Sequence, residues 1–181
     1  MKNYYNSDIQ EKFNLESEWN AKKWINLDFT KLQDLRNEAG IYRVQLKIDL
    51  RKEPIRTHFV GNHEVFADLS QDTYLSVGKT MNLQKRLLSQ HFSSNLSGNR
   101  LGRHLATLFP DYGTTGKYTP KRKNAKEQEY FYIDKNGIQT LIEEEKIRID
   151  FFYEDIWWKR DLFETYGKAH YKCLFDLGVE H

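Results

Sequence analysis

The sequence predicts an α+β fold in which helices flank a small, mainly antiparallel sheet. Residues 41–50 alternate apolar and polar side chains imperfectly, as a strand does, whereas residues 83–92 place apolar side chains at the i,i+4 spacing of a helix. The expected elements follow the order strand, strand, helix, helix, strand, helix. With 181 residues the chain is long enough for one core and short for two, so we expect a single domain over residues 1–181.

Composition and charge describe a folded chain without a global preference for polyanions. The 28 basic and 26 acidic residues leave a formal charge of +2, so nucleic-acid binding has to come from local basic clusters. The single cysteine, Cys173, excludes an internal disulfide and a zinc site built on several thiolates. The chain has no apolar leader and no stretch near the roughly 20 apolar residues of a membrane span, which predicts a cytoplasmic protein.

The first half of the chain is expected to contain the two main strands of the sheet. The positions of glycine, proline and alternating apolar residues predict where each segment of this half begins and ends. In chain order these are an N-terminal extension (1–29) with a short strand (21–29), a helical turn (30–40) closed by Gly40 as a C-cap, a first strand (40–50), an insertion (about 51–71) with a candidate extra strand (55–61), and a second strand (73–78).

The second half is expected to contain most of the helices. Its segments are a helix (81–92) that follows a turn at Gly78 and is capped by Thr80, a second helix (100–109), an exposed basic loop (110–128), a helix (138–146), a strand (147–154), and a long helix (155–178) that begins at Asp155 and ends at Gly178. The long helix is expected to bury one stripe of side chains, namely Trp158, Leu162, Tyr166, Ala169 and Cys173. Both Trp157 and Trp158 are expected to pack.

The two main strands carry the residues of a candidate phosphate site. If residues 40–42 and 74–80 pair antiparallel as neighbours, they bring Tyr42 and Lys79 close to the first turn of the following helix, which holds Arg86. A phenol, an ammonium group and a guanidinium group bind apolar ligands poorly and hold a phosphate well. The backbone N–H groups at the start of the helix would add to such a site.

The same residues carry a resemblance to a known family. The stretches "GIY" (residues 40–42) and "VGKTMNLQKRLLSQHF" (residues 77–92) resemble the GIY-YIG nuclease superfamily. The signature of that superfamily is a GIY strand, a YIG strand and a glycine-lysine-threonine-asparagine-leucine run that leads to an arginine on the first helix. A later strand and a long helix with "LFE" at residues 162–164 keep the family's order, so the resemblance covers about residues 30–177.

This resemblance implies a metal-dependent DNA endonuclease, for example a restriction-type, phage or mobile-element enzyme. Tyr42 would take a proton from the attacking water, and Glu164 would hold one divalent ion, Mg²⁺ or Mn²⁺. Arg86 would stabilise charge on the phosphate, and Lys79 would lower the pKa of Tyr42 from its usual value of about 10. His91 would assist as a proton carrier.

The second motif departs from the family at one position. Ser76 stands where a tyrosine is expected, and Tyr74 lies two residues earlier, on the same face of a regular strand. Either side chain would donate a hydrogen bond to the nucleophile or to the phosphate. Asp161 and Glu154 are alternative acids should Glu164 not hold the ion.

Basic residues suggest two surfaces that contact DNA. The helix at residues 100–109 offers Arg100, Arg103 and His104. The basic loop offers Lys117, Lys121, Arg122, Lys123 and Lys126. Cutting both DNA strands with one site per chain needs two copies or two visits, so a homodimer would suit a restriction enzyme. Two alternatives stay open, namely a nucleic-acid- or protein-binding module with a decayed catalytic site and an unrelated soluble domain.

Overall fold

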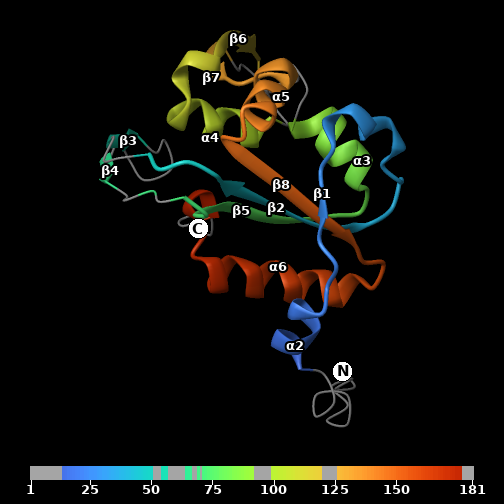
Figure 1. The fold of residues 1–181 in the computed structure, drawn as a ribbon. Helices are drawn as coiled ribbons and strands as arrows, with labels where there is room; N and C mark the ends of the chain where they lie inside the picture. The colour runs from blue at the N-terminus through green and yellow to red at the C-terminus, as the bar shows by residue number, and fades with distance from the viewer. Residues whose placement is uncertain are drawn as a thin grey trace.

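The computed structural model describes residues 14–50, 54–56, 64–66, 69, 71–91, 99–119 and 126–176. Its centre is a four-stranded antiparallel sheet with the strand order β1–β8–β2–β5. The strands are β1 (Ile25–Asn26), β2 (Gly40–Leu46), β5 (Tyr74–Thr80) and β8 (Ile147–Tyr153). Together with the helices on both faces, this sheet confirms the predicted α+β class (Figure 1).

Helical layers cover both faces of the sheet. One face is covered by α6 (Trp157–Tyr171) and α2 (Leu15–Asn20) (Figure 1). The other face carries α3 (Leu83–Lys85), the π-helix η2 (Arg86–His91), α4 (Arg100–Leu108), α5 (Lys135–Glu143) and a two-stranded sheet of β6 (Thr114–Tyr118) and β7 (Gln128–Tyr132). The remaining elements are short: η1 (Phe29–Asp34), β3 (Pro54–Arg56), β4 (Glu64–Phe66), η3 (Pro110–Tyr112) and η4 (Leu174–Asp176).

Strand β2 lies in the middle of this arrangement and is buried on both faces. Tyr42 and Val44 belong to the core cluster under α3, α4 and α5, while Ile41 belongs to a second cluster with Trp19 and Phe163 under α6 and α2. Because both faces are covered, apolar side chains are needed at successive positions rather than at alternate ones. This explains why the alternation in residues 41–50 is imperfect.

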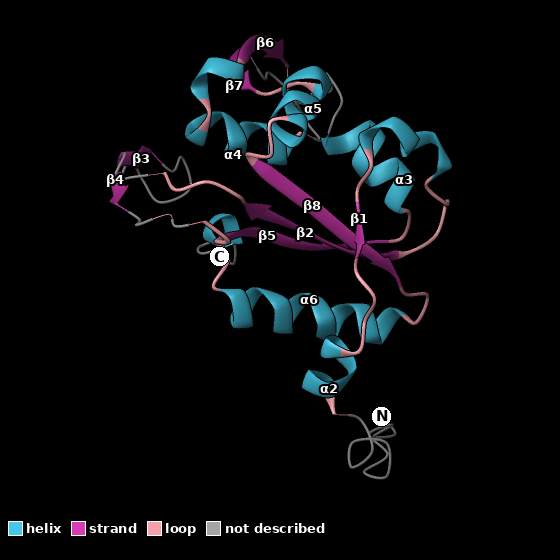
Figure 2. Cartoon of the chain, in the orientation of Figure 1, coloured by secondary structure: helices cyan, strands magenta, loops and turns pink. Residues whose placement is uncertain are grey.

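Most predicted elements are confirmed, with shifted ends (Figure 2). The strands predicted at 40–50, 73–78 and 147–154 are β2, β5 and β8, the short strand is β1, and the helices predicted at 81–92, 100–109, 138–146 and 155–178 are α3 with η2, α4, α5 and α6. The extra strand predicted at 55–61 is represented by β3 up to Arg56, and its other residues lie outside the described part of the chain. Within the described residues, no helix is long and apolar enough to cross a membrane.

Three predicted caps and turns are wrong. Gly40 is the first residue of β2 rather than a C-cap, because it pairs with Thr80 and Tyr153 in the sheet. Asn82, not Thr80, caps the helix that follows β5, and its side-chain oxygen accepts a hydrogen bond from the Lys85 N–H at 2.8 Å. Gly78 lies inside β5, two residues before that strand ends, and makes no turn.

The prediction of a loop at residues 110–128 is also wrong in part. Residues 114–118 form β6, which pairs antiparallel with β7, a strand that the sequence did not predict. The prediction failed because glycine and threonine are typical of turns when they cluster, but here the partner strand satisfies their backbone groups. Residues 120–125 lie outside the described part of the chain.

The long helix α6 is shorter than predicted and buries a different face. It begins after Ile156, without the expected cap from Asp155, and it ends at Tyr171, where Lys172 adopts a φ of 49°. Gly178 lies outside the described residues.

The side chains that α6 buries are Arg160, Phe163 and Gly167, so the predicted stripe, in which Leu162 and Ala169 are in fact exposed, is wrong. Trp157 is 67% exposed and does not pack as expected. Gly167 decides how closely α6 approaches the sheet, because a Cβ atom there would lie 2.7 Å from the Trp19 ring and 3.0 Å from Val77.

Candidate active site

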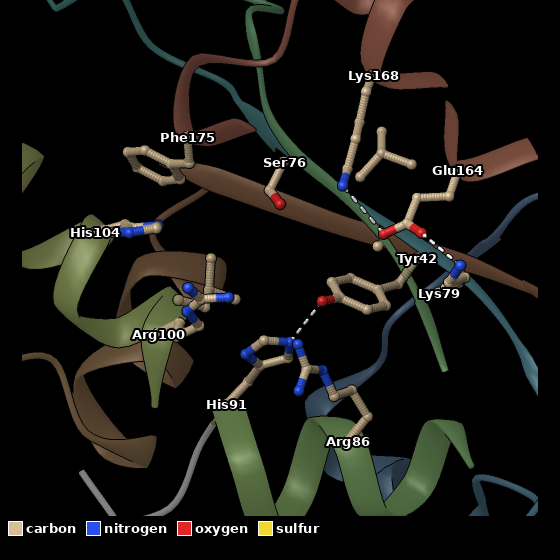
Figure 3. A pocket seen from close by; sticks show the side chains of 13 residues that line it. Tyr42, Ser76, Lys79, Arg86, His91, Arg100, His104, Glu164, Lys168 and Phe175 are labelled. Atoms are coloured by element: carbon tan, nitrogen blue, oxygen red, sulfur yellow. Dashed lines mark hydrogen bonds and ion pairs between the residues drawn. The ribbon is translucent and has the colours of Figure 1, made fainter. Parts of the chain in front are cut away.

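A pocket of about 120 Å³ lies at the β5 edge of the sheet (Figure 3). It is lined mainly by polar and charged side chains, which come from β2, β5, η2, α4 and α6, namely Tyr42, Ser76, Lys79, Arg86, His91, Arg100, His104, Glu164 and Lys168. Four of these side chains are cationic at neutral pH and one is a carboxylate. Such a pocket suits a phosphate better than an apolar ligand.

The predicted pairing of the two tyrosine-bearing strands is confirmed. Tyr42 lies opposite Gly78, and Ile41 lies opposite Lys79, in an antiparallel register. Paired residues project from the same face, so Tyr42 lies on the α3 and α4 side of the sheet, whereas Lys79 reaches the α6 side. Because β5 is the last strand of the sheet, side chains from both of its faces border one pocket.

Gly78 leaves the space in which the Tyr42 ring lies. A Cβ atom on Gly78 would be 2.4 Å from the Tyr42 hydroxyl oxygen and from Cζ of its ring. The ring cannot retreat easily, since Tyr42 is buried against the core. Glycine at this position is therefore required by the tyrosine and not by a change of chain direction.

The Tyr42 hydroxyl contacts a histidine that the sequence proposed only as an assisting residue. The Nε2 atom of His91 lies 2.7 Å from the hydroxyl oxygen of Tyr42, and both side chains are buried (Figure 3). Lys79, expected to act on Tyr42, instead donates a hydrogen bond to Asp161 on α6 at 2.8 Å. His91 is thus an ionisable group that touches the phenol directly.

The π-helical turn η2 explains how His91 reaches the pocket together with Arg86. The two are five positions apart, and in an α-helix this spacing would turn them to different sides, with Gln90 next to Arg86. A π-helix closes its hydrogen bonds between residues i and i+5, so residues five apart lie one above the other. Arg86 and His91 both line the pocket as a result.

Burial keeps both histidines of the pocket neutral. Desolvation, followed by the charge of Arg86 and by His104, lowers the pKa of His91 to about 3. Desolvation, followed by the charges of Arg103 and Arg100, lowers the pKa of His104 to about 4. A neutral imidazole has one nitrogen that accepts a hydrogen bond, so Nε2 of His91 can accept the hydrogen bond of the Tyr42 hydroxyl.

The low pKa of His91 predicts that the protein loses stability in mild acid. The unfolded chain binds a proton at His91 below about pH 6.5, whereas the folded chain binds it only near pH 3. Stability is therefore fully present above pH 6.5 and falls as the pH drops towards 3, by about 2 to 3 kcal/mol at pH 4.5 from this residue.

We expect His91→Gln, which does not titrate, to lose less stability than the unaltered protein between pH 7 and pH 4.5. Urea unfolding at the two pH values measures the difference. Equal losses in the two proteins would show that His91 is protonated in the folded state.

A second prediction concerns Gly78. In Gly78→Ala the added methyl group displaces the Tyr42 ring, and we expect turnover of any substrate of this pocket to fall by about tenfold or more, since small misplacements of a reacting group are costly. Gly113→Ala is the matched control, because its methyl group would meet the Phe131 ring, outside the pocket, at 2.1 Å. Steady-state rates of the folded variants, checked by circular dichroism, test this; similar losses in both variants would contradict it.

Glu164 borders the pocket from α6 and is paired with two lysines (Figure 3). Its Oε2 atom lies 3.3 Å from Nζ of Lys79, and its Oε1 atom lies 3.2 Å from Nζ of Lys168. The hydrogen bond to Asp161, together with the Glu164 carboxylate, raises the pKa of Lys79 above its usual value, so Lys79 is charged at neutral pH.

The two alternative acids do not line the pocket. Asp161 lies one turn before Glu164 on α6 and is exposed. Glu154 is buried, forms an ion pair with Lys22 at 2.7 Å and accepts a hydrogen bond from the Ile156 N–H, so it stabilises the start of α6. Among the three acids, the structure brings only Glu164 to the pocket.

Tyr74 lies away from the pocket, which corrects the prediction that it shares a face with Ser76. The β2–β5 register shifts between Val44 and Gln45, so Ser76 lies opposite Val44 and Tyr74 opposite Gln45. One extra residue in a strand reverses the direction of the side chains beyond it. Tyr74 consequently stacks on Tyr171 of α6 at 3.7 Å, where burial raises its pKa to about 12, while Ser76 lines the pocket.

The predicted DNA-contacting residues fall into three groups. Arg100 and His104 line the pocket, whereas Arg103 packs over the Tyr130 ring at 5.4 Å. Lys117 lies on β6 and forms an exposed ion pair with Glu127 at 3.4 Å, and Lys126 is exposed. Lys121, Arg122 and Lys123 lie outside the described part of the chain.

Lys168 and Phe175 also line the pocket and were not among the site residues predicted from the sequence. Lys168 lies four residues after Glu164, and this Glu–Lys spacing on a helix is a signal that predicts an ion pair. Phe175 reaches the pocket because η4 folds back beside β5 after α6, and its ring contacts His104 at 4.7 Å. No local pattern predicts that return of the chain.

The donor set of the pocket fits one magnesium-type ion better than zinc. The described residues contain no group of three or more His, Cys, Asp or Glu side chains that could hold a metal ion. Zinc needs three or four protein ligands, whereas Mg²⁺ keeps several waters and takes one or two carboxylates with oxygens of its substrate. Glu164 is the residue that would hold such an ion.

Comparison with known proteins adds no relative. No family model, no curated protein and no solved structure matches the chain. The residues of the pocket are therefore the basis on which a function can be inferred.

Proposed function

We propose that the protein is a metal-dependent endonuclease of the GIY-YIG type that hydrolyses phosphodiester bonds in DNA. The observation that supports this most directly is the hydrogen bond between Tyr42 and His91 beside Arg86, Lys79 and Glu164 in one pocket. The phenol offers a base, the cations offer contacts for a phosphate, and the carboxylate offers a ligand for a divalent ion. These are the components that phosphodiester hydrolysis requires.

In this mechanism Tyr42 and His91 work as a pair. The Tyr42 oxygen accepts a proton from the attacking water, while the Tyr42 hydroxyl proton passes to Nε2 of His91. A phenol alone, with an ordinary pKa of about 10, is seldom ionised at neutral pH, so a neighbouring acceptor is needed. Burial leaves Nε2 of His91 without a proton, and a phosphate anion bound beside it would favour the imidazolium that the transfer forms.

Cationic side chains around the pocket would bind the scissile phosphate. Arg86 presents a planar guanidinium group that suits two phosphate oxygens, and Arg100 borders the same space from α4. Glu164 would hold the divalent ion, which would supply neutralisation of the charge that develops on the phosphate and on the leaving group. Ser76 lies in the pocket, where its hydroxyl offers a further hydrogen bond to the phosphate.

The proposal is tested by incubating the protein with supercoiled plasmid. We expect cleavage with Mg²⁺ or Mn²⁺, and complete loss of cleavage when EDTA removes the ion. In the proposed mechanism the ion neutralises the charge that develops on the leaving oxygen, and without the ion this charge is not neutralised. Ca²⁺ serves as a control for an ion that supports binding but poor hydrolysis. Equal cleavage with and without EDTA would overturn the metal-dependent mechanism.

A nucleic-acid-binding module without catalysis is the second candidate. It is favoured by the two lysines that pair with both oxygens of Glu164, and by Ser76 in the position of the second motif tyrosine. Binding to DNA that weakens steeply with salt, in the absence of any cleavage across a panel of DNA and RNA substrates, would support this candidate instead.

A further inference from the structure

Both oxygens of the Glu164 carboxylate are engaged by ammonium groups (Figure 3). Lys168 is 3.2 Å from one oxygen, and Lys79 is 3.3 Å from the other. Each lysine thus occupies a position that a divalent cation at Glu164 would need. A divalent ion at Glu164 would be repelled by both ammonium groups, so the lysines and the metal compete for the carboxylate.

The two lysines differ in what holds them. Lys79 also donates to Asp161 at 2.8 Å, so it keeps an anionic partner when it leaves Glu164. For Lys168, the acidic partner within the described residues is Glu164. Lys168 would therefore lose its acidic partner when a divalent cation binds Glu164, and another anion would be needed to replace it.

A phosphate in the pocket would be that new anion. Lys168 lines the pocket together with Arg86 and Arg100, so a phosphate bound by these arginines lies in the space that Lys168 borders. The lysine side chain is a point charge on a flexible four-carbon stem, and about a third of it is exposed, which allows it to exchange one anion for another.

We propose that Lys168 is a phosphate-contacting residue that neutralises Glu164 in the free protein and moves to a phosphate oxygen when the substrate binds. Its departure exposes Glu164 to the divalent ion, so substrate and metal bind with positive coupling. Coupling of this kind is reciprocal, because each ligand raises the affinity for the other by the same factor. This inference rests on the proposed function, which places a phosphate and a metal ion in the pocket.

The first test measures Mn²⁺ binding to the 181-residue chain without DNA, by the loss of the electron paramagnetic resonance signal of aqueous Mn²⁺. We expect Lys168→Gln to bind Mn²⁺ about three- to tenfold more tightly than the unaltered protein, since one competing cation is gone. Lys172→Gln removes the same charge one turn further on, from an exposed position, and is expected to change the affinity less. Unchanged or weaker binding in Lys168→Gln would overturn the proposal.

The second test measures the coupling itself. Sulfate, a tetrahedral anion that does not precipitate Mn²⁺, stands in for the phosphate at fixed ionic strength. We expect sulfate to tighten Mn²⁺ binding in the unaltered protein and in Lys172→Gln, and to do so by a smaller factor in Lys168→Gln. The same factor in all three proteins would overturn the role of Lys168.

These outcomes separate this inference from the proposed function. Plasmid cleavage together with an unchanged Mn²⁺ affinity in Lys168→Gln would remove only the role of Lys168. The absence of Mn²⁺ binding in all three proteins, with no plasmid cleavage, would overturn both.

Discussion

Replacing Tyr42 by phenylalanine is expected to reduce metal-dependent DNA cleavage by about 10²- to 10⁴-fold, the range typical of a lost general base. The change removes one oxygen and keeps the ring that lies over Gly78, so the strand pairing has no reason to shift. It also leaves Nε2 of His91 without its hydroxyl partner, at a cost of about 1 kcal/mol in stability. The rate of plasmid nicking, compared with the thermal unfolding midpoint, separates the two effects.

Tyr166→Phe is the matched control for this prediction. Tyr166 lies on α6, where it packs against Trp19 and stacks on His170, and it does not line the pocket. The control is expected to cleave at the rate of the unaltered protein. Full activity of Tyr42→Phe would show that the phenol is only a packing residue, and would remove the mechanism proposed for the pair with His91.

Replacing Glu164 by glutamine is expected to reduce cleavage by more than about 100-fold. Losing a residue that only hydrogen-bonds to a metal ligand costs roughly 10- to 100-fold, and Glu164 is proposed to be the ligand itself. The substitution keeps the size of the side chain and removes the charge that a divalent ion requires. It also removes both ion pairs to Lys79 and Lys168, which are partly exposed and contribute little to stability. Cleavage rates measured over a range of Mg²⁺ concentrations reveal whether the loss is in metal affinity or in turnover.

Asp161→Asn provides the control for Glu164. Asp161 lies on the same helix and binds the same Lys79, but it is exposed and does not line the pocket. We expect it to retain most of the activity, with a Mg²⁺ dependence close to that of the unaltered protein. The reverse order of effects, with Asp161→Asn inactive and Glu164→Gln active, would assign the ion to the other acid.

Much of the fold follows from local pattern. The strands at residues 40–46, 74–80 and 147–153 carry apolar and β-branched residues, and α4 repeats leucines at helical spacing, so element type was predictable. Boundaries were less predictable. Asn82 and Thr80 are both good caps by residue type, and only the path of the chain after β5 decides between them.

In the pocket, too, some placements were predictable from the sequence and others were not. Tyr42, Lys79 and Arg86 were predicted to lie close together, because short antiparallel strands and the helix that follows them leave few arrangements. The placement of His91 depends on a π-helical turn, and the displacement of Tyr74 depends on a shift in strand register. A shift of one residue changes which side of a strand or helix a side chain occupies, and residue types alone do not reveal it.

Local sequence pattern was enough to predict the α+β class, the strands that hold Tyr42 and Ser76, and the supply of cations that a phosphate site needs. Which acid joins them, and which imidazole contacts the phenol, depended on tertiary packing. Glu164 comes from a helix on one face of the sheet and His91 from a helical turn on the other, and they meet because β5 is the last strand and Gly78 leaves room for Tyr42 there. Contacts across such distances in the chain depend on how layers pack, whereas periodicity in sequence reports only on near neighbours.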